Sequence, residues 1–189
     1  MRKESTLPAA YRDDPRVRFA ETREAVNRTA RTVLSQELGL TITITPISDQ
    51  AARQAHHWQY SGTRVEHRPG WSWPLEVARY RRIARRIEAA FYTEDGLWGL
   101  LLGRISNARV VASIHYLERN PEQGQAIQFV DAALRYLELY AVATRCTTYA
   151  VNHPHPELVN YYKSKGLTGE LRKGQKLIRL ESTVDSAGD

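Results

Sequence analysis

The chain has 189 residues, of which 42% are hydrophobic and 25% charged, the size and composition of one globular domain with at most a short appendage. This composition excludes disorder throughout the chain. The single cysteine, Cys146, cannot form an internal disulfide, and no apolar run approaches the roughly 20 residues of a membrane span. Residues 1–10 lack the apolar stretch of a signal peptide, so we expect a cytoplasmic protein with no membrane partner.

The net charge is +6, from 27 basic and 21 acidic residues, and 22 of the basic residues are arginine. The planar fork of donors on arginine suits phosphate groups. Anionic partners are therefore expected, and nucleotides, a phosphorylated cofactor and RNA all remain open at this point.

A helical extension is predicted over residues 1–40. Asp14 followed by Pro15 is typical of a helix start, and apolar residues then recur at helical spacing until Gly39. The helix has one apolar stripe, which must pack either on the main domain or on a second copy of the chain, so a homodimer is one alternative.

The main domain is predicted over residues 41–181. It begins with a strand from Thr41 that ends at Pro46, followed by a helix from Ser48 or Asp49 to about Tyr60. A polar loop rich in aromatic residues covers 63–73, and a second helix covers 74–82.

Three antiparallel strands are predicted next, over residues 87–92, 97–104 and 109–118. Asp95-Gly96 and Ser106-Asn107 supply the hairpin turns, because both pairs tolerate the positive φ of tight turns.

A long amphipathic helix follows over 124–143, then a strand over 146–151, a helix over 156–165 and a last strand over 176–180. Residues 182–189 are expected to form a flexible tail. This order of elements predicts an α/β fold with a mixed, mostly antiparallel sheet flanked by helices.

The segment from Glu118 to Ala126 connects a strand directly to the start of the long helix. The free N–H groups at a helix N-terminus attract anions, and Gly124 and Ala126 would let a phosphate approach the backbone closely. An ordinary loop is the alternative, since the chain has neither a Walker motif nor GxGxxG.

A second motif lies near the C-terminus, where a strand ending at Asn152 leads into a helix that reads Leu-Val-Asn-Tyr-Tyr from Leu158 and ends at Gly166-Leu167. This pattern resembles the C-terminal motif of the GNAT family of acyl-CoA dependent N-acyltransferases. The resemblance extends in element order from about Ile42 to Leu180. It implies the GNAT fold, acetyl-CoA as cosubstrate and an amine as acceptor.

The resemblance also implies roles for individual residues. Tyr162 occupies the position that often protonates the leaving CoA thiolate, and the N–H groups near Leu117 and Arg119 would polarise the thioester carbonyl. Pro121 stands where the family has Arg or Gln, so the backbone must hold the pyrophosphate. The residues expected to bind the cofactor are Leu117, Arg119, Gln123, Gly124, Gln125, Ala126, Asn152 and Tyr161.

Amine acylation also needs a base, and Glu118 at the end of the third strand is the candidate. Its alternative is a surface carboxylate paired with Arg119 or Arg145. His115 is the reserve base, although strict alternation places it on the same face as Leu117 rather than Glu118. The alternative for Tyr162 is a structural role, in which its ring only packs on one face of the helix.

The acceptor side is predicted to be formed by the aromatic loop, with Trp71, Trp73 and His115 lining the substrate site. Anchoring of the loop to the sheet is the alternative for the tryptophans. Cys146 is expected to be a small buried side chain, and the adjacent His56 and His57 make a poor metal site, so no metal is predicted.

Two other functions remain open. The five arginines between Arg79 and Arg86 could bind RNA phosphates with nearby aromatic residues stacking on bases, or they could pair with Glu88, Glu94 or Asp95. These possibilities can merge in a GNAT-like enzyme that acts on charged tRNA. A family member that binds CoA without turnover is the third alternative.

Overall fold

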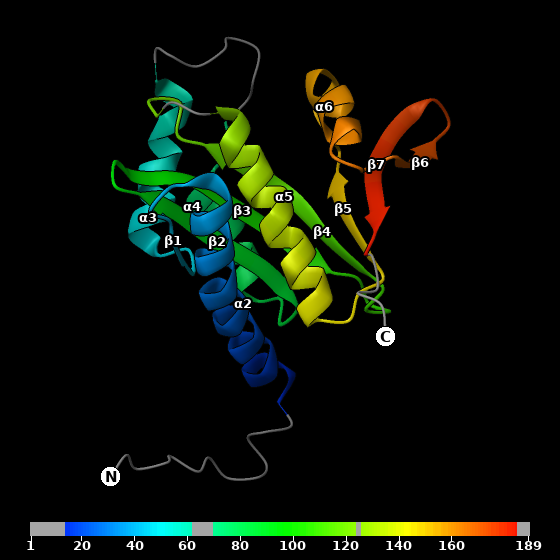
Figure 1. The fold of residues 1–189 in the computed structure, drawn as a ribbon, viewed down its shortest axis with the longest axis horizontal. Helices are drawn as coiled ribbons and strands as arrows, with labels where there is room; N and C mark the ends of the chain where they lie inside the picture. The colour runs from blue at the N-terminus through cyan, green and yellow to red at the C-terminus, as the bar shows by residue number, and fades with distance from the viewer. Residues whose placement is uncertain (1–13, 62–69, 124–125, 185–189) are drawn as a thin grey trace.

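The structure is a computed structural model that describes residues 14–61, 70–123 and 126–184 (Figure 1). Its strands form one mixed sheet in the order β1-β2-β3-β4-β5-β7-β6, in which only β4 and β5 pair in parallel. The strands are β1 (Thr43–Thr45), β2 (Arg86–Thr93), β3 (Gly96–Ile105), β4 (Val111–Arg119), β5 (Thr148–Asn152), β6 (Gly169–Lys173) and β7 (Lys176–Thr183). The predicted fold class is confirmed.

Several helix ends coincide with the signals in the sequence. They are α2 (Pro15–Leu38), α3 (Asp49–His56), α4 (Trp73–Arg81), α5 (Ala126–Ala143) and α6 (Val159–Ser164). The Asp14 carboxylate accepts a hydrogen bond from the N–H of Arg16 at 2.8 Å, and Gly39 ends the same helix with φ +64°. Ser48 caps α3 by accepting from the N–H of Ala51 at 3.0 Å.

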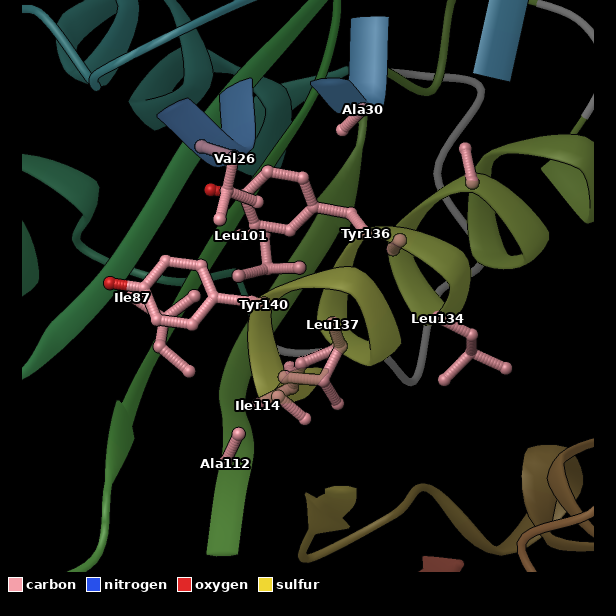
Figure 2. Close-up of a cluster of buried hydrophobic side chains, with 14 of the residues drawn as sticks. Val26, Ala30, Ile87, Leu101, Ala112, Ile114, Leu134, Tyr136, Leu137 and Tyr140 are labelled. Carbon is pink, nitrogen blue, oxygen red and sulfur yellow. The ribbon is translucent and has the colours of Figure 1, made fainter. Parts of the chain in front are cut away.

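The helices cover both faces of the sheet and create two cores. On one face α2 and α5 lie side by side, and α5 packs over β3 and β4 (Figure 1). Figure 2 shows Val26 and Ala30 of α2 meeting Tyr136 and Tyr140 of α5 above the sheet. On the other face α3 and α4 enclose a smaller core around Trp58.

The apolar stripe of α2 packs on the main domain, which is one of the two alternatives for it. Val26, Ala30 and Leu34 are buried in the same core as α5. Polar contacts fix the helix as well, since the Tyr136 hydroxyl donates to the Asn27 side-chain oxygen at 2.8 Å. The helix is therefore part of the layer that covers the sheet.

Several elements differ from the predictions. The helix that begins at Asp49 ends at His56 and continues as a 3₁₀ turn to Tyr60. The last strand continues through Glu181 to Thr183, paired with β5, so the chain is not frayed there. Strand β6 was not predicted, because four of its five residues are exposed and it lacks the alternation of a half-buried strand.

A bulge interrupts β4 and shapes the sheet around it. Leu102 of β3 pairs with Tyr116 and Gly103 with Ile114, so His115 is the extra residue on β4. A Cβ on Gly103 would lie 2.1 Å from the carbonyl oxygen of Ser113. The bulge and Gly103 therefore depend on each other.

None of the helices in the described ranges is long and apolar enough to cross a membrane.

Replacing Gly103 with alanine should destabilise the fold. The added methyl group collides with backbone, which cannot move aside as a side chain would, so we expect a loss of about 1 to 3 kcal/mol in the free energy of unfolding. Urea unfolding followed by tryptophan fluorescence measures this loss. An unchanged transition would show that the bulge does not require glycine opposite it.

Candidate functional site

The two parallel strands of the sheet diverge after a short paired segment. β4 and β5 pair from Val111 opposite Thr148 to Ile114 opposite Val151, while β4 continues to Arg119. From His115 to Arg119, β4 therefore continues with no residue of β5 paired opposite it, and we call the β5 side of this segment the opening. This opening is the centre of the candidate site.

Backbone N–H groups of β4 point toward that opening. The N–H of Asn120 donates to the carbonyl oxygen of Trp98 at 2.8 Å, so this position bonds toward β3. N–H groups alternate in direction along an antiparallel strand, so those of Leu117 and Arg119 face the β5 side. Both residues are predicted cofactor contacts, and their N–H directions fit that role.

A polar cluster lies where the strands begin to diverge. The amide nitrogen of Asn152 lies 2.7 Å from Nε2 of His115 and 3.2 Å from the Ser113 hydroxyl. The same hydroxyl lies 3.1 Å from Nε2 of His115. Since the Asn152 amide donates, Nε2 accepts and the ring proton is on Nδ1. Asn152 is thus engaged with β4.

The bulge corrects the predicted orientation of His115. The rings of both His115 and Tyr116 contact Tyr80 of α4, at centroid distances of 6.0 and 5.7 Å. Two successive residues therefore face α4, and the alternation restarts so that Leu117 packs on the α5 side and Glu118 faces α4. His115 shares a face with Glu118, contrary to the prediction from strict alternation.

The environment of His115 keeps its imidazole neutral. Burial, followed by the nearby Arg104 and His153, lowers the pKa of His115 to about 4. The ring therefore carries no charge at neutral pH.

Glu118 is held by an aromatic donor beneath it. The indole N–H of Trp73, at the start of α4, donates to Oε2 of Glu118 at 2.5 Å. The Trp73 side chain has no exposed surface, so it cannot line a substrate site as predicted. It positions the carboxylate instead, while the predicted pairing of Glu118 with Arg119 or Arg145 stays a prediction.

Aromatic rings continue from this carboxylate along the α4 face of β4. Trp71 packs edge-on against Tyr116 at 4.9 Å between centroids and remains 36% exposed. Tyr116 in turn hydrogen-bonds Glu76, and burial and this contact raise its pKa. Trp71 therefore keeps part of its ring at the surface next to Tyr116, and its role in substrate binding stays a prediction.

Tyr162 lies on the opposite face of the sheet. Its ring is 4% exposed and packs in the core that α5 covers, together with Val151 and Leu167. The adjacent Tyr161 donates its hydroxyl to Asp131 of α5 at 2.5 Å, and Lys165 pairs with the same carboxylate at 3.0 Å. Burial and Asp131 raise the pKa of Tyr161. These contacts fix α6 against α5.

The predicted anion loop is only partly described. Gly124 and Gln125 lie outside the described residues, and Ala126 is the first residue of α5. The side-chain amide of Gln123 donates to the carbonyl oxygen of Asp95 at 3.0 Å, so it is directed toward the β2–β3 turn. Asn120 shapes the preceding turn by donating to Leu97 and accepting from the N–H of Glu122.

Most of the arginines from 79 to 86 have partners. The pairs are Arg79 with Glu76 at 3.1 Å, Arg81 with Asp49 at 2.7 Å, Arg86 with Glu88 at 2.7 Å, and Arg85 with Asn107 at 2.7 Å. The predicted pairing with Glu88 is thus present for Arg86. Trp73 and Tyr80 are buried, so they cannot stack on bases.

Other predicted features can also be placed. Cys146 is buried, and burial raises its pKa, as expected of a structural thiol. Across the described ranges no group of three metal-ligating side chains occurs. Ser113 was missed, although its spacing of two from His115 would place both side chains on one face of a regular strand.

The hydrogen bond between Trp73 and Glu118 should be measurable by a double-mutant cycle. We expect Trp73→Phe and Glu118→Ala to be non-additive by about 1.5 to 3 kcal/mol in the free energy of unfolding, the range for a hydrogen bond to a charged group. The cycle cancels the loss of ring volume. Additive single effects would show that the contact contributes no stability.

The pKa of His115 predicts a loss of stability in acid. The unfolded side chain binds a proton near pH 6.5 and the folded one only near pH 4, so stability falls as the pH drops between these values. Between pH 7 and pH 5, wild type should lose roughly 2 kcal/mol more than His115→Gln. Urea unfolding at pH 7 and pH 5 measures this difference. If wild type and His115→Gln lose the same stability, the imidazole of His115 becomes charged in the folded protein as readily as in the unfolded chain.

Known structures share the fold of this chain at low sequence identity. No family model and no curated protein matches the sequence. Among solved structures, an acetyltransferase from Thermus thermophilus matches 76% of this chain and 97% of its own, with 14% identity and a TM-score of 0.58.

Two further structures match similarly. The ribosomal-protein-S18-alanine N-acetyltransferase of Escherichia coli covers 78% of this chain and 97% of its own, with 14% identity and a TM-score of 0.53. The PaiA N-acetyltransferase of Thermoplasma acidophilum, solved with coenzyme A, covers 76% and 99%, with 14% identity and a TM-score of 0.52. The chain therefore has the fold of the GNAT N-acetyltransferases.

Proposed function

We propose that this protein is an N-acetyltransferase that transfers the acetyl group of acetyl-CoA to a primary amine. The observation that carries the proposal is the opening beside β4, where the N–H groups of Leu117 and Arg119 point and which Glu118 and the Ser113–His115–Asn152 cluster border. The fold supports it, because similar structures are N-acetyltransferases and one of them is complexed with coenzyme A.

The N–H groups on the β5 side of β4 fit a thioester carbonyl. A donor pair aimed at an oxygen that gains negative charge lowers the barrier to acyl transfer. Leu117 and Arg119 supply two such N–H groups on one strand. In the proposal the start of α5, with Gln123, Gly124, Gln125 and Ala126, accepts the pyrophosphate, and Asn152 and Tyr161 border the rest of the cofactor.

The chemistry requires one base and one acid. Acetyl-CoA supplies the acetyl group as a thioester, and the amine nitrogen bonds to the carbonyl carbon as the carbon–sulfur bond breaks. Glu118 accepts the proton of the attacking amine, directly or through a water. Tyr162 donates a proton to the departing sulfur, which suits a phenol that is protonated at neutral pH.

Glu118 is a better base than His115 on the geometry. Nε2 of His115 already accepts from Asn152, and its Nδ1 carries the ring proton, so neither nitrogen offers a lone pair. A carboxylate attracts an ammonium group, and Trp73 positions the carboxylate of Glu118 by donating to its Oε2. Trp71, exposed beside it, would line the acceptor site.

Binding and turnover experiments test this function. We expect calorimetry to detect acetyl-CoA binding by wild type and by both Glu118→Gln and Tyr162→Phe. With an active amine from a panel that includes spermidine and an alanine-terminated peptide, kcat should fall by about 10² to 10⁴ for Glu118→Gln and should also fall for Tyr162→Phe.

Matched control variants keep this test specific. Glu138→Gln and Tyr149→Phe remove the same chemical groups from α5 and β5, outside the site, and should keep wild-type turnover. Absence of acetyl-CoA binding at millimolar concentration would refute the proposal. Full turnover by Glu118→Gln would leave the proposed transferase function standing but would exclude Glu118 as the base.

A further inference from the structure

A groove lined by arginines runs along α2, away from the opening beside β4. It consists of two adjoining hollows of about 530 and 580 Å³ that share Ala20, Arg23 and Arg86. α2 forms one wall, and the other wall comes from the end of β1, the end of α4 and the start of β2. We call it the arginine groove, and its arginines are Arg16, Arg23, Arg28, Arg31, Arg81, Arg82 and Arg86.

We propose that the arginine groove binds the phosphate backbone of a single-stranded nucleic acid. The proposal is independent of the transferase function, because Arg81 and Arg82 lie at the end of α4 opposite to Trp73, which holds Glu118.

The charge of the groove favours an anion. Seven arginines line it against two glutamates, Glu24 and Glu88. Glu88 is 3% exposed and already lies 2.7 Å from Arg86 and 3.7 Å from Arg23, so it is neutralised within the protein. Glu24 pairs with Arg28.

Three exposed arginines of the groove hold no acidic partner within the described ranges. They are Arg16, Arg31 and Arg82, and no ion pair of the described chain includes them. Arg81, by contrast, pairs with Asp49. An unpaired guanidinium keeps all its donors for a ligand, and its fork fits a phosphate group.

The length of the groove favours a polymer over a small anion. Arg16 and Arg31 are fifteen residues apart on α2, which corresponds to about 22 Å along the helix. One strand of B-form DNA carries a phosphate every 3.4 Å or so, and about 22 Å therefore matches roughly six phosphates. A single phosphate would meet only one of the unpaired arginines.

The lining between the arginines is partly apolar, from Ala20, Ile44 and Pro46. Within the described ranges no aromatic residue lines the groove, so stacking on bases is absent there. Binding should therefore depend on the phosphates and be independent of base sequence.

This surface differs from the one that sequence reasoning indicated. One alternative from the sequence was that the run from Arg79 to Arg86 binds phosphates while aromatic neighbours stack on bases. In the structure Arg79 and Arg85 are engaged elsewhere, and α2 supplies four of the seven arginines of the groove.

The test compares two double variants that remove the same charge. Arg16→Gln/Arg82→Gln changes the groove, and Lys173→Gln/Lys176→Gln changes the turn between β6 and β7. β6 and β1 are opposite edges of the sheet, so the two sites are far apart (Figure 1). All four side chains are exposed, and circular dichroism and thermal unfolding confirm that both variants fold.

The probe is a fluorescent oligouridylate of about 12 nucleotides, whose binding is followed by anisotropy from low to high salt. We expect wild type and the lysine variant to bind alike. For the groove variant the slope of log K against log salt should shrink by about 1.4, with binding roughly tenfold weaker at low salt.

Three results would overturn the proposal. These are no binding of the oligouridylate by wild type at low salt, equal slopes for the two double variants, and binding of oligoglutamate as tight as that of the oligouridylate. The last result would identify an acidic peptide as the occupant. An oligoadenylate of the same length should bind like the oligouridylate, and a large difference would contradict recognition through phosphates.

Discussion

The loss of pairing between β4 and β5 after Ile114 and Val151 is the constraint on which the candidate site depends. Parallel strands that stayed in register would satisfy each other's backbone and leave no opening. The bulge at His115 occurs one residue beyond the last pair, which allows β4 to bend while it stays bonded to β3. Gly103 makes this possible, because any larger residue would meet the carbonyl oxygen of Ser113. Gly103 on β3 thus permits the bulge in β4.

A second constraint is the burial of charge beneath α2. Arg23 and Glu88 are both nearly inaccessible, and the Arg23 guanidinium also donates to the carbonyl oxygen of Ala84 at 3.2 Å. Burial of an unpaired charge is costly, so each group needs its partners. Burial, followed by Arg86, lowers the pKa of Arg23, and Glu88 opposes that shift. The contact fixes the position of α2 on the sheet, which in turn sets the spacing of the exposed arginines.

Sequence patterns predicted the regular elements well and the irregular ones poorly. The spacing of Val26, Ala30 and Leu34 follows directly from a helix with one buried stripe. The bulge could not be predicted, because a single extra residue leaves the composition of the strand unchanged while it reverses the alternation beyond it. For that reason His115 was assigned to the wrong face. Trp73 was predicted to line the substrate site, but it is buried beneath Glu118, which agrees with the alternative that the tryptophans anchor their loop to the sheet. The carboxylate itself was found because it ends a strand.

The proposed base and acid lie on opposite faces of the sheet. Glu118 lies on the α4 side, where Trp73 holds it, and Tyr162 lies within the core on the α5 side. A thioester that enters between the diverging strands would therefore meet the acceptor on one side and the proton donor on the other. This arrangement would place the two proposed proton transfers on separate faces of the sheet. The end of the β4–β5 pairing after Ile114 and Val151 is the place in the sheet where one substrate could reach both groups.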